Sequence, residues 1–258
     1  MPELPEVEDA ARRIRAILLG RRLVRITLHH AAYRRRLPRA QARLAEGKRV
    51  LAVERRGKHQ LIRLEDDVTL LVHFRMTGDW KTGNSSAPLD RFARAHLLFD
   101  DDLRVSFIDS RALGTLTVHR GLDGLPDAVT EPLDAGFTSR ALGRALARRR
   151  IPIKVALLDQ RIVAGIGNIY AAEALWRAKI DPRTPANGLE TAALRRLVPA
   201  IRATLRTALG APARYSQASD ERFEVYDREG KLCRRCRTKI QRITQAQRST
   251  YFCSTCQH

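Results

Sequence analysis

The chain has 258 residues, of which 44% are hydrophobic, so it is long enough to bury one large core or two modest ones. Its 48 lysines and arginines outnumber its 28 acidic residues, and the net charge of +20 predicts a polyanionic partner, DNA or RNA. The acidic start is unlike a signal peptide and every apolar run is too short to span a bilayer, so we expect a cytoplasmic, nucleoid-associated protein without membrane contact.

The chain begins MPELPEVEDA, which is short, acidic and stiff, whereas a nucleic-acid binder would ordinarily begin with a disordered basic arm. Residues 5–19 are predicted to form a helix. Pro5 suits the first helical position and Gly20 suits the end, and apolar residues recur between them at helical spacing. The residues that precede this helix therefore need a role of their own.

From residue 22 to about residue 119 the pattern changes to short runs that are typical of β-strands. These runs are LVRITL, RVLAVERR, HQLIRL, VTLLVHF, AHLLF, LRVSFID and TLTVH. Turn sequences such as TGNSSAP separate them, and no helix is expected between them. This arrangement predicts an antiparallel β-sandwich or barrel, which residues 121–136 connect to the rest of the chain as a linker.

The pattern after the linker is helical. Predicted helices lie in SRALGRALARRR, NIYAAEALWRAKI and ETAALRRLVPAIRATLRTAL, and a β-like segment runs from RFEVYDREGKLC to STYFC. The sequence thus predicts an α+β protein with an N-terminal β-rich domain (residues 1–120), the linker (121–136), a helical domain (137–222) and a small cysteine module (223–258).

The four cysteines form two Cys-x2-Cys pairs, with sixteen residues between the pairs. These cysteines are Cys233, Cys236, Cys253 and Cys256, and we expect them to be metal ligands. Two such pairs close a tetrahedral Zn²⁺ site, with one pair from each knuckle of a hairpin. Four thiolates leave no open coordination position, so we expect one structural zinc ion that folds the hairpin and takes no part in chemistry.

A glycine turn, AGIGN, precedes the second predicted helix. Gly165 and Gly167 lie just before the helix, and Asn168 is expected to be its N-cap. Exposed N–H groups at such a helix start bind phosphate, although a glycine turn also serves as plain punctuation between elements. Its place in a basic helical half favours contact with a DNA backbone.

Motifs along the whole chain resemble those of formamidopyrimidine-DNA glycosylases. They are MPELPEVE, RRGKHQL, HFRMTG, DSRALG, IVAGIGNIYAAEALWRAKIDP and CRRCRTKI with QRSTYFCSTCQ, and they run in order from residue 2 to residue 257. The resemblance implies an N-terminal β-sandwich with an N-terminal helix, then a helix–two-turn–helix domain and a zinc-ribbon hairpin. It also implies a monomeric glycosylase/AP lyase that acts on double-stranded DNA with oxidised bases or abasic sites.

The start of the chain has a chemical role in this family. Once Met1 is removed, Pro2 has a free secondary amine, which titrates near pH 8 and is more available as a nucleophile than a lysine. Attack of Pro2 on the sugar displaces the base and gives an iminium ion, with Glu3 as general acid/base. The resemblance makes Lys58 the second catalytic lysine and Arg248 the zinc-hairpin arginine that grips phosphates and assists the final elimination.

Six further positions match residues of the family that contact DNA. Those expected at or near phosphates are His73, Arg149 and Asn168. Those expected to fill the space that an everted base leaves are Met76, Arg111 and Leu113. Eversion is required because the sugar carbon and the damaged base are inaccessible inside a duplex.

Three positions depart from the family pattern. Leu113 replaces the usual phenylalanine wedge, and Arg237 stands where a glycine is expected in the first knuckle. The segment GAPARYSQASDERFEVY is short, so residues 210–222 are too few to form a lid over a flipped purine. We therefore expect formamidopyrimidines, oxidised pyrimidines and abasic sites to be processed better than 8-oxoguanine.

Other functions fit parts of the sequence. An endonuclease VIII-like enzyme that prefers oxidised pyrimidines fits the short segment, whereas MPELPEVE and Met76 favour an enzyme for oxidised purines. A catalytically silent binder of damaged DNA, or a zinc-ribbon protein that binds RNA, fits the charge and the cysteines. Neither binder needs Pro2, Glu3 and Lys58 together, and the sequence therefore favours the enzyme.

Overall fold

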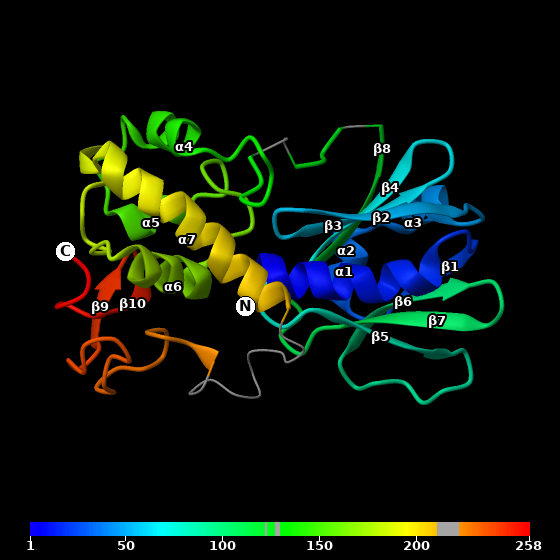
Figure 1. Cartoon of the computed structure of the whole chain (residues 1–258). Helices are drawn as coiled ribbons and strands as arrows, with labels where there is room; N and C mark the ends of the chain where they lie inside the picture. The colour runs from blue at the N-terminus through cyan, green and yellow to red at the C-terminus, as the bar shows by residue number, and fades with distance from the viewer. Residues whose placement is uncertain (122, 127–129, 211–221) are drawn as a thin grey trace. The chain divides into compact units, whose positions relative to one another are not determined.

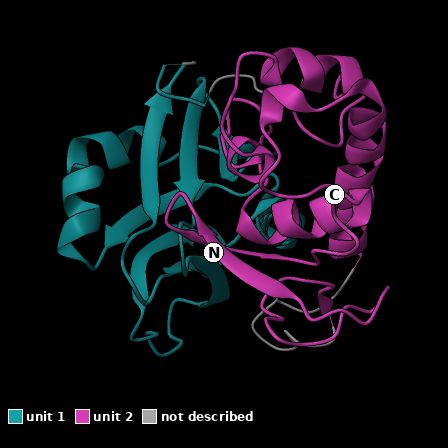
Figure 2. Cartoon of the chain, turned by 90° about the vertical axis from the view of Figure 1, so that its left-hand side faces the viewer, with its two compact units in different colours: residues 1–128 teal, residues 129–258 magenta. Residues whose placement is uncertain are grey.

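The computed structural model describes residues 1–121, 123–126, 130–210 and 222–258. The chain divides into two compact units, residues 1–128 and 129–258 (Figure 2). The boundary lies inside the segment 121–136, and the second unit holds both the helical segment and the cysteine module. None of the helices in the described ranges is long and apolar enough to cross a membrane.

The first unit contains a helix, α1 (Leu4–Leu18), and two antiparallel four-stranded sheets (Figure 1). One sheet has the order β1-β6-β7-β5, with β1 (Leu23–Leu28), β5 (Asp79–Asn84), β6 (Ala93–Phe99) and β7 (Leu103–Ile108). The other has the order β2-β3-β4-β8, with β2 (Val50–Arg56), β3 (His59–Leu64), β4 (Val68–His73) and β8 (Thr115–Arg120).

Apolar side chains from α1 and from both sheets form one continuous core, which confirms the predicted sandwich. Its buried members include Val7, Ala11, Ile14, Leu18, Ile26, Leu97, Val105, Phe107, Val53, Ile62, Val72 and Leu116. Helices cover the two open sides of the sandwich, where edge strands would otherwise expose unpaired backbone groups. On one side α1 contacts β2, β3 and β5, and it starts one residue earlier than predicted.

The prediction of no helix between the strands was wrong. Two short helices, α2 (Ala31–Arg36) and α3 (Arg39–Ala45), follow β1 and contact both β1 and β8, so they cover the second open side. The segment HAAYRRRLPRAQARLA shows little helical periodicity because it is rich in arginine and interrupted by Pro38. Only a few of its side chains reach the core, among them Tyr33 and Leu37.

Strand β5 was also missed, because its sequence DWKTGN overlaps the segment that was expected to form turns. Only Trp80 of this strand is buried, so the alternation of apolar and polar residues that indicates a strand is almost absent. The strand exists because it pairs along its full length with β7. Tertiary pairing here overrides a weak local pattern.

The second unit contains the predicted helices α4 (Ser139–Leu146), α6 (Asn168–Ala178) and α7 (Thr191–Leu209). It also contains α5 (Ile153–Leu157), a 3-10 helix (Ala186–Gly188) and a hairpin of β9 (Gln241–Gln245) and β10 (Arg248–Phe252). Both α4 and α6 pack against α7. Residues 222–226 were expected to be β-like but form no strand, because the Glu173 carboxylate accepts the N–H groups of Glu224, Val225 and Tyr226 at 2.9 Å.

A buried polar side chain, Gln60 of β3, fixes α1 against the sandwich. Its Nε2 donates to the carbonyl oxygen of Val7 at 2.9 Å, and its Oε1 accepts from Nε1 of Trp80 at 2.6 Å. The three residues belong to α1, β3 and β5, so one amide group connects the helix to both sheets. The position of the N-terminus depends on this connection.

Replacing Gln60 with leucine is expected to lower the free energy of unfolding by about 2–3 kcal/mol, because the Val7 carbonyl and the Trp80 N–H stay buried without partners. Chemical denaturation measures this change. Gln41→Leu, at an exposed position of α3, is the matched control and should change stability little. Equal stability of the two variants would contradict the structural role of Gln60.

Candidate functional site

The start of α1 is held by a capping box at Glu3. The Glu3 side chain is buried, and the Glu6 carboxylate accepts the backbone N–H of Glu3 at 2.9 Å. The Val7 N–H donates to the Glu3 carbonyl at 3.0 Å and begins the helical hydrogen bonds. Reciprocal bonds of this kind fix the angle at which the chain enters the helix. Pro2, which is half-buried and directly precedes Glu3, is held close to the helix start.

Charged side chains surround the amino terminus. Burial lowers the pKa of the Met1 amino group, and the positive charges of Lys58 and Arg111 lower it further. The carboxylates of Glu3 and Glu6 act in the opposite direction. The structure therefore brings the N-terminal amine, Glu3, Lys58 and Arg111 together in a place where an amine loses its proton readily.

Lys58 and His73 lie near each other, where β3 begins and β4 ends. Lys58 is buried, and the next residue, His59, pairs across the sheet with His73, so that the ring centroids are 4.6 Å apart. Burial lowers the pKa of His73 to about 3, and His59, Arg75 and Lys58 add to this effect. The Arg75 N–H donates to Nδ1 of His73 at 2.9 Å. His73 is therefore neutral at pH 7 and its proton lies on Nε2.

Met76 and Leu113 are two large apolar side chains that are left in contact with solvent. Met76 is 37% exposed and Leu113 is 40% exposed. Each directly follows a non-glycine residue in the left-handed backbone region, Arg75 with φ +52° and Ala112 with φ +53°. Strained backbone of this kind is typical of functional loops.

The glycine turn of the second unit leads directly into α6. Gly165 has φ +81°, and Gly167, not Asn168, is the N-cap. The prediction of Asn168 as N-cap was therefore wrong. The reason is that its side chain faces β10, where Nδ2 donates to the Ser249 carbonyl at 2.9 Å and Oδ1 accepts from Nζ of Lys154.

Arg248 is the first residue of β10. A two-residue turn of Ala246 (φ +46°) and Gln247 (φ +60°) precedes it, and Arg248 pairs across the hairpin with Gln245. Its side chain is exposed. Because Asn168 binds the carbonyl of Ser249, the start of α6 and the turn of the hairpin lie side by side within the second unit.

Arg149 lies beyond the end of α4, away from any regular element. Its Nη2 is 3.7 Å from Oδ2 of Asp159, and this carboxylate also binds Arg161. The hydrogen bond from Arg161 and the charge of Arg149 contribute to lowering the pKa of Asp159. Arg149 is therefore an ion-paired side chain in this structure.

Sequence reasoning missed Lys154, which is fully buried (0% exposed) in α5. Its Nζ donates to the Ser249 carbonyl at 2.9 Å, to Oγ1 of Thr250 at 2.8 Å and to Oδ1 of Asn168. It thus fastens α5 and the start of α6 to the strand that begins with Arg248. The available signal was a single lysine inside the apolar run IPIKVALL, since buried lysines require specific partners.

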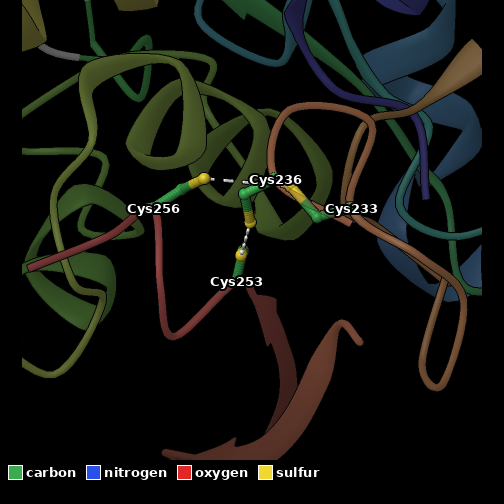
Figure 3. Close-up of side chains that lie close together, drawn as sticks. All are labelled: Cys233, Cys236, Cys253 and Cys256. Atoms are coloured by element: carbon green, nitrogen blue, oxygen red, sulfur yellow. Dashed lines mark hydrogen bonds between the residues drawn. The ribbon is translucent and has the colours of Figure 1, made fainter. Parts of the chain in front are cut away.

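The four cysteines form one cluster (Figure 3), and all four Sγ atoms lie within 4.8 Å of one another. Tetrahedral zinc with Zn–S bonds of about 2.3 Å requires sulfur atoms about 3.8 Å apart. The separations of 3.3 Å (Cys236 to Cys253) and 4.0 Å (Cys233 to Cys256) lie on either side of this value. The residues fit one structural zinc ion with four thiolate ligands.

The first zinc knuckle closes despite the missing glycine. Arg237 adopts φ +67°, and its N–H donates to the Cys233 carbonyl at 2.9 Å. The cysteine module also packs on α6, where the Arg235 guanidinium lies 3.9 Å from the centroid of the Trp176 ring. The module and the helix therefore share one apolar cluster, which includes Trp176 and Cys233.

Replacing Cys233 with alanine is expected to abolish zinc binding and to expose Trp176, because hairpin folding and metal binding are coupled. Native mass spectrometry should find one zinc ion per chain in the unmodified protein and none in the variant, whose tryptophan emission should shift to the red. Thr255→Ala, in the second knuckle, is the control that should keep the metal. Full zinc content in Cys233→Ala would contradict the site.

Comparisons with known proteins match the whole chain. Residues 1–116 match the formamidopyrimidine-DNA glycosylase N-terminal domain, residues 129–219 match the H2TH domain of the same glycosylase, and residues 230–258 match a zinc finger found in FPG and IleRS. The formamidopyrimidine-DNA glycosylase of Chloroflexus aurantiacus is 42% identical over 272 residues, which cover 100% of this chain and 98% of the relative.

Solved structures agree. The crystal structure of MutM (FPG) from Thermus thermophilus has a TM-score of 0.87 at 36% identity and covers 99% of this chain and 98% of that one. A mutant of Lactococcus lactis FPG in complex with a Fapy-dG containing DNA has a TM-score of 0.90 at 30% identity, with 100% of both chains covered. This chain belongs to the formamidopyrimidine-DNA glycosylase family.

Proposed function

We propose that the chain is a bifunctional DNA glycosylase/AP lyase of base excision repair. It excises oxidised bases from duplex DNA and then nicks the strand by β,δ-elimination. The observation that carries this proposal is the half-buried amino terminus, where burial and the charges of Lys58 and Arg111 lower the pKa of the amine beside Glu3. The lesion-bearing DNA in the complex of the Lactococcus lactis relative supports the substrate class.

Pro2 is the nucleophile in this proposal. Removal of Met1 gives Pro2 the terminal amine, whose nitrogen attacks C1′ of the damaged nucleotide. The N–C1′ bond forms, the glycosidic bond breaks, and the base leaves with the electron pair and a proton. The sugar ring then opens: the nitrogen lone pair forms the C1′=N bond of the iminium ion, the C1′–O4′ bond breaks, and O4′ takes up a proton. The iminium ion acidifies C2′–H, and loss of this proton expels the 3′ phosphate, after which a second elimination releases the 5′ phosphate. Glu3, whose carboxylate acts on the pKa of the terminal amine, serves as general acid/base.

The other residues of the first unit assist catalysis or hold the DNA. Lys58 is a catalytic lysine, and its charge lowers the pKa of the terminal amine. His73 is neutral and therefore contacts phosphate as a hydrogen-bond donor through Nε2, not as a cation. Met76, Arg111 and Leu113 fill the space that the everted base leaves.

The second unit grips phosphates. Arg248, at the turn of the zinc hairpin, contacts the phosphates around the lesion and assists the last elimination, and Asn168 binds the backbone beside it. Arg149, whose side chain is 41% exposed beside Asp159, also contacts phosphate. The zinc ion folds the hairpin that carries Arg248. We infer that the protein acts as a monomer on double-stranded DNA in the cytoplasm.

A non-catalytic binder of damaged DNA is the alternative from another class. Such a protein requires cations and a wedge, which this chain has, but it requires no deprotonated amine. The lowered pKa of the terminal amine and the burial of Glu3 and Lys58 beside it favour the enzyme.

Covalent trapping tests the enzyme directly. Borohydride is expected to link the protein to DNA with an abasic site by reducing the iminium ion, and Pro2→Gly should lower the trapping rate about tenfold or more, because the secondary amine is lost. Pro38→Gly, before α3, is the control and should trap at the unmodified rate. Trapping by Pro2→Gly at the same rate would place the nucleophile elsewhere.

The lesion preference stays a prediction. Residues 211–221, which make up nearly all of the segment expected to be too short for a lid, lie outside the described residues, so the preference rests here on Leu113. Leucine unstacks a base step with less area than phenylalanine, which favours lesions that leave the stack easily.

Single-turnover excision should be about tenfold or more slower for 8-oxoguanine opposite cytosine than for formamidopyrimidine or dihydrothymine in the same duplex, because 8-oxoguanine stacks and pairs well. Leu113→Phe should reduce this difference. Equal rates for the three lesions would refute the preference. Faster excision of dihydrothymine than of formamidopyrimidine would favour the endonuclease VIII-like alternative.

A further inference from the structure

Asp109 directly follows β7, and its side chain is completely buried (0% exposed). Both of its carboxylate oxygens accept hydrogen bonds. Oδ2 accepts from the Tyr33 hydroxyl at 2.8 Å and from the Gly114 N–H at 2.7 Å. Oδ1 accepts from the Thr77 hydroxyl and from the Arg111 N–H, the latter at 3.3 Å. Each oxygen therefore has two donors.

Apart from Tyr33 of α2, these donors belong to two loops that are far apart in the sequence. Thr77 directly follows Met76, whereas Arg111 and Gly114 lie on either side of Leu113. One carboxylate thus binds both the loop that carries Met76 and the loop that carries Leu113. These are the two loops in which a strained, left-handed residue precedes an exposed apolar side chain.

The surroundings of Asp109 leave the second loop little freedom. The Arg36 guanidinium donates to the Gly114 carbonyl at 2.6 Å. A Cβ atom on Gly114 would lie 2.8 Å from the Phe107 ring and from the Tyr33 hydroxyl, so only glycine fits there. The loop is therefore pressed against the core at Gly114, and Leu113 projects from a fixed base.

We propose that Asp109 is a positioning residue for base eversion, which holds Met76 and Leu113 so that both enter the DNA as one rigid unit. The inference rests on the void-filling roles proposed above for these two side chains. A wedge on a flexible loop loses conformational entropy when it inserts, whereas a wedge that is already held in place does not. Asp109 thereby acts on eversion and not on the chemistry at the sugar.

Asp109→Asn tests the proposal with little change in shape. An asparagine offers one oxygen and one NH2 group. With the NH2 at the Oδ2 position it faces the Gly114 N–H, and at the Oδ1 position it faces the Arg111 N–H, neither of which can accept. In either orientation the loop that carries Leu113 therefore loses one of its hydrogen bonds to residue 109.

The readout is the ratio of two single-turnover excision rates, for one formamidopyrimidine lesion paired with cytosine and for the same lesion in an unpaired bulge. Only the paired lesion has to be everted from a stable stack. Asp109→Asn is expected to lower the rate on the paired lesion about tenfold or more and to change the rate on the bulge by less than about twofold. Lys58→Ala should slow both, so that the ratio stays the same.

A double-mutant cycle assigns the effect to the wedge. Because Asp109 is proposed to act through Leu113, adding Asp109→Asn to Leu113→Ala should lower the rate on the paired lesion little further. Thr77→Val removes a hydroxyl that donates to Asp109 and accepts the Arg111 N–H at 3.3 Å, and its effect should likewise disappear when Met76 and Leu113 are both replaced by alanine. Thr77→Val also replaces Asp109→Asn as the test variant if thermal unfolding shows that Asp109→Asn does not fold.

Two outcomes are distinguishable. In the first, Met76→Ala and Leu113→Ala change the ratio, but Asp109→Asn and Thr77→Val slow both substrates equally or not at all. This result overturns the positioning role of Asp109 and leaves the void-filling roles of Met76 and Leu113 in place. If Met76→Ala and Leu113→Ala leave the ratio unchanged, the proposed void-filling roles themselves fail.

Discussion

In the proposed mechanism the terminal amine attacks carbon only after it loses its proton, and the half-buried start of the chain lies where burial, Lys58 and Arg111 lower the pKa of an amine. The capping box at Glu3 keeps the terminus in that place. The bonds of Gln60 hold α1 against both sheets, so the terminus leads directly into a helix that is fixed to the core. The proposed role of Pro2 gives the acidic, proline-containing start of a basic protein a chemical reason.

In the second unit, too, the residues that are proposed to contact phosphate are held on a fixed backbone. The Lys154 ammonium, buried among oxygen acceptors, holds the start of α6 to the strand that begins with Arg248. The zinc site of four cysteines folds the module that carries this strand, and the module packs on α6 through Trp176. A long arginine side chain can thus be presented from a fixed backbone, which lowers the entropy lost when it binds.

Local patterns in the sequence predicted the parts of the fold that local forces determine. The run HQLIRL coincides with β3, and the spacing of the cysteines predicted their cluster. Helices α2 and α3 were missed because they form to cover the side of the sandwich between β1 and β8, which is a tertiary requirement.

Buried polar contacts escaped sequence reasoning for a related reason. Asp109 and Tyr33 are 76 positions apart, and Lys154 and Ser249 are 95 apart. The hydrophobic periodicity of a local segment carries no information about such distant pairs. The N-cap prediction for Asn168 failed in the same way, because a distant strand takes its side chain.

The chain's own amino terminus is the proposed nucleophile, and the Lys58 amine, which acts on the pKa of the terminal amine, is the competing candidate. Mass spectrometry of the borohydride-trapped protein, after digestion, locates the sugar adduct directly. We expect the adduct on the peptide of residues 2–12, at the nitrogen of Pro2. An adduct on Lys58, with an unmodified Pro2, would contradict this claim.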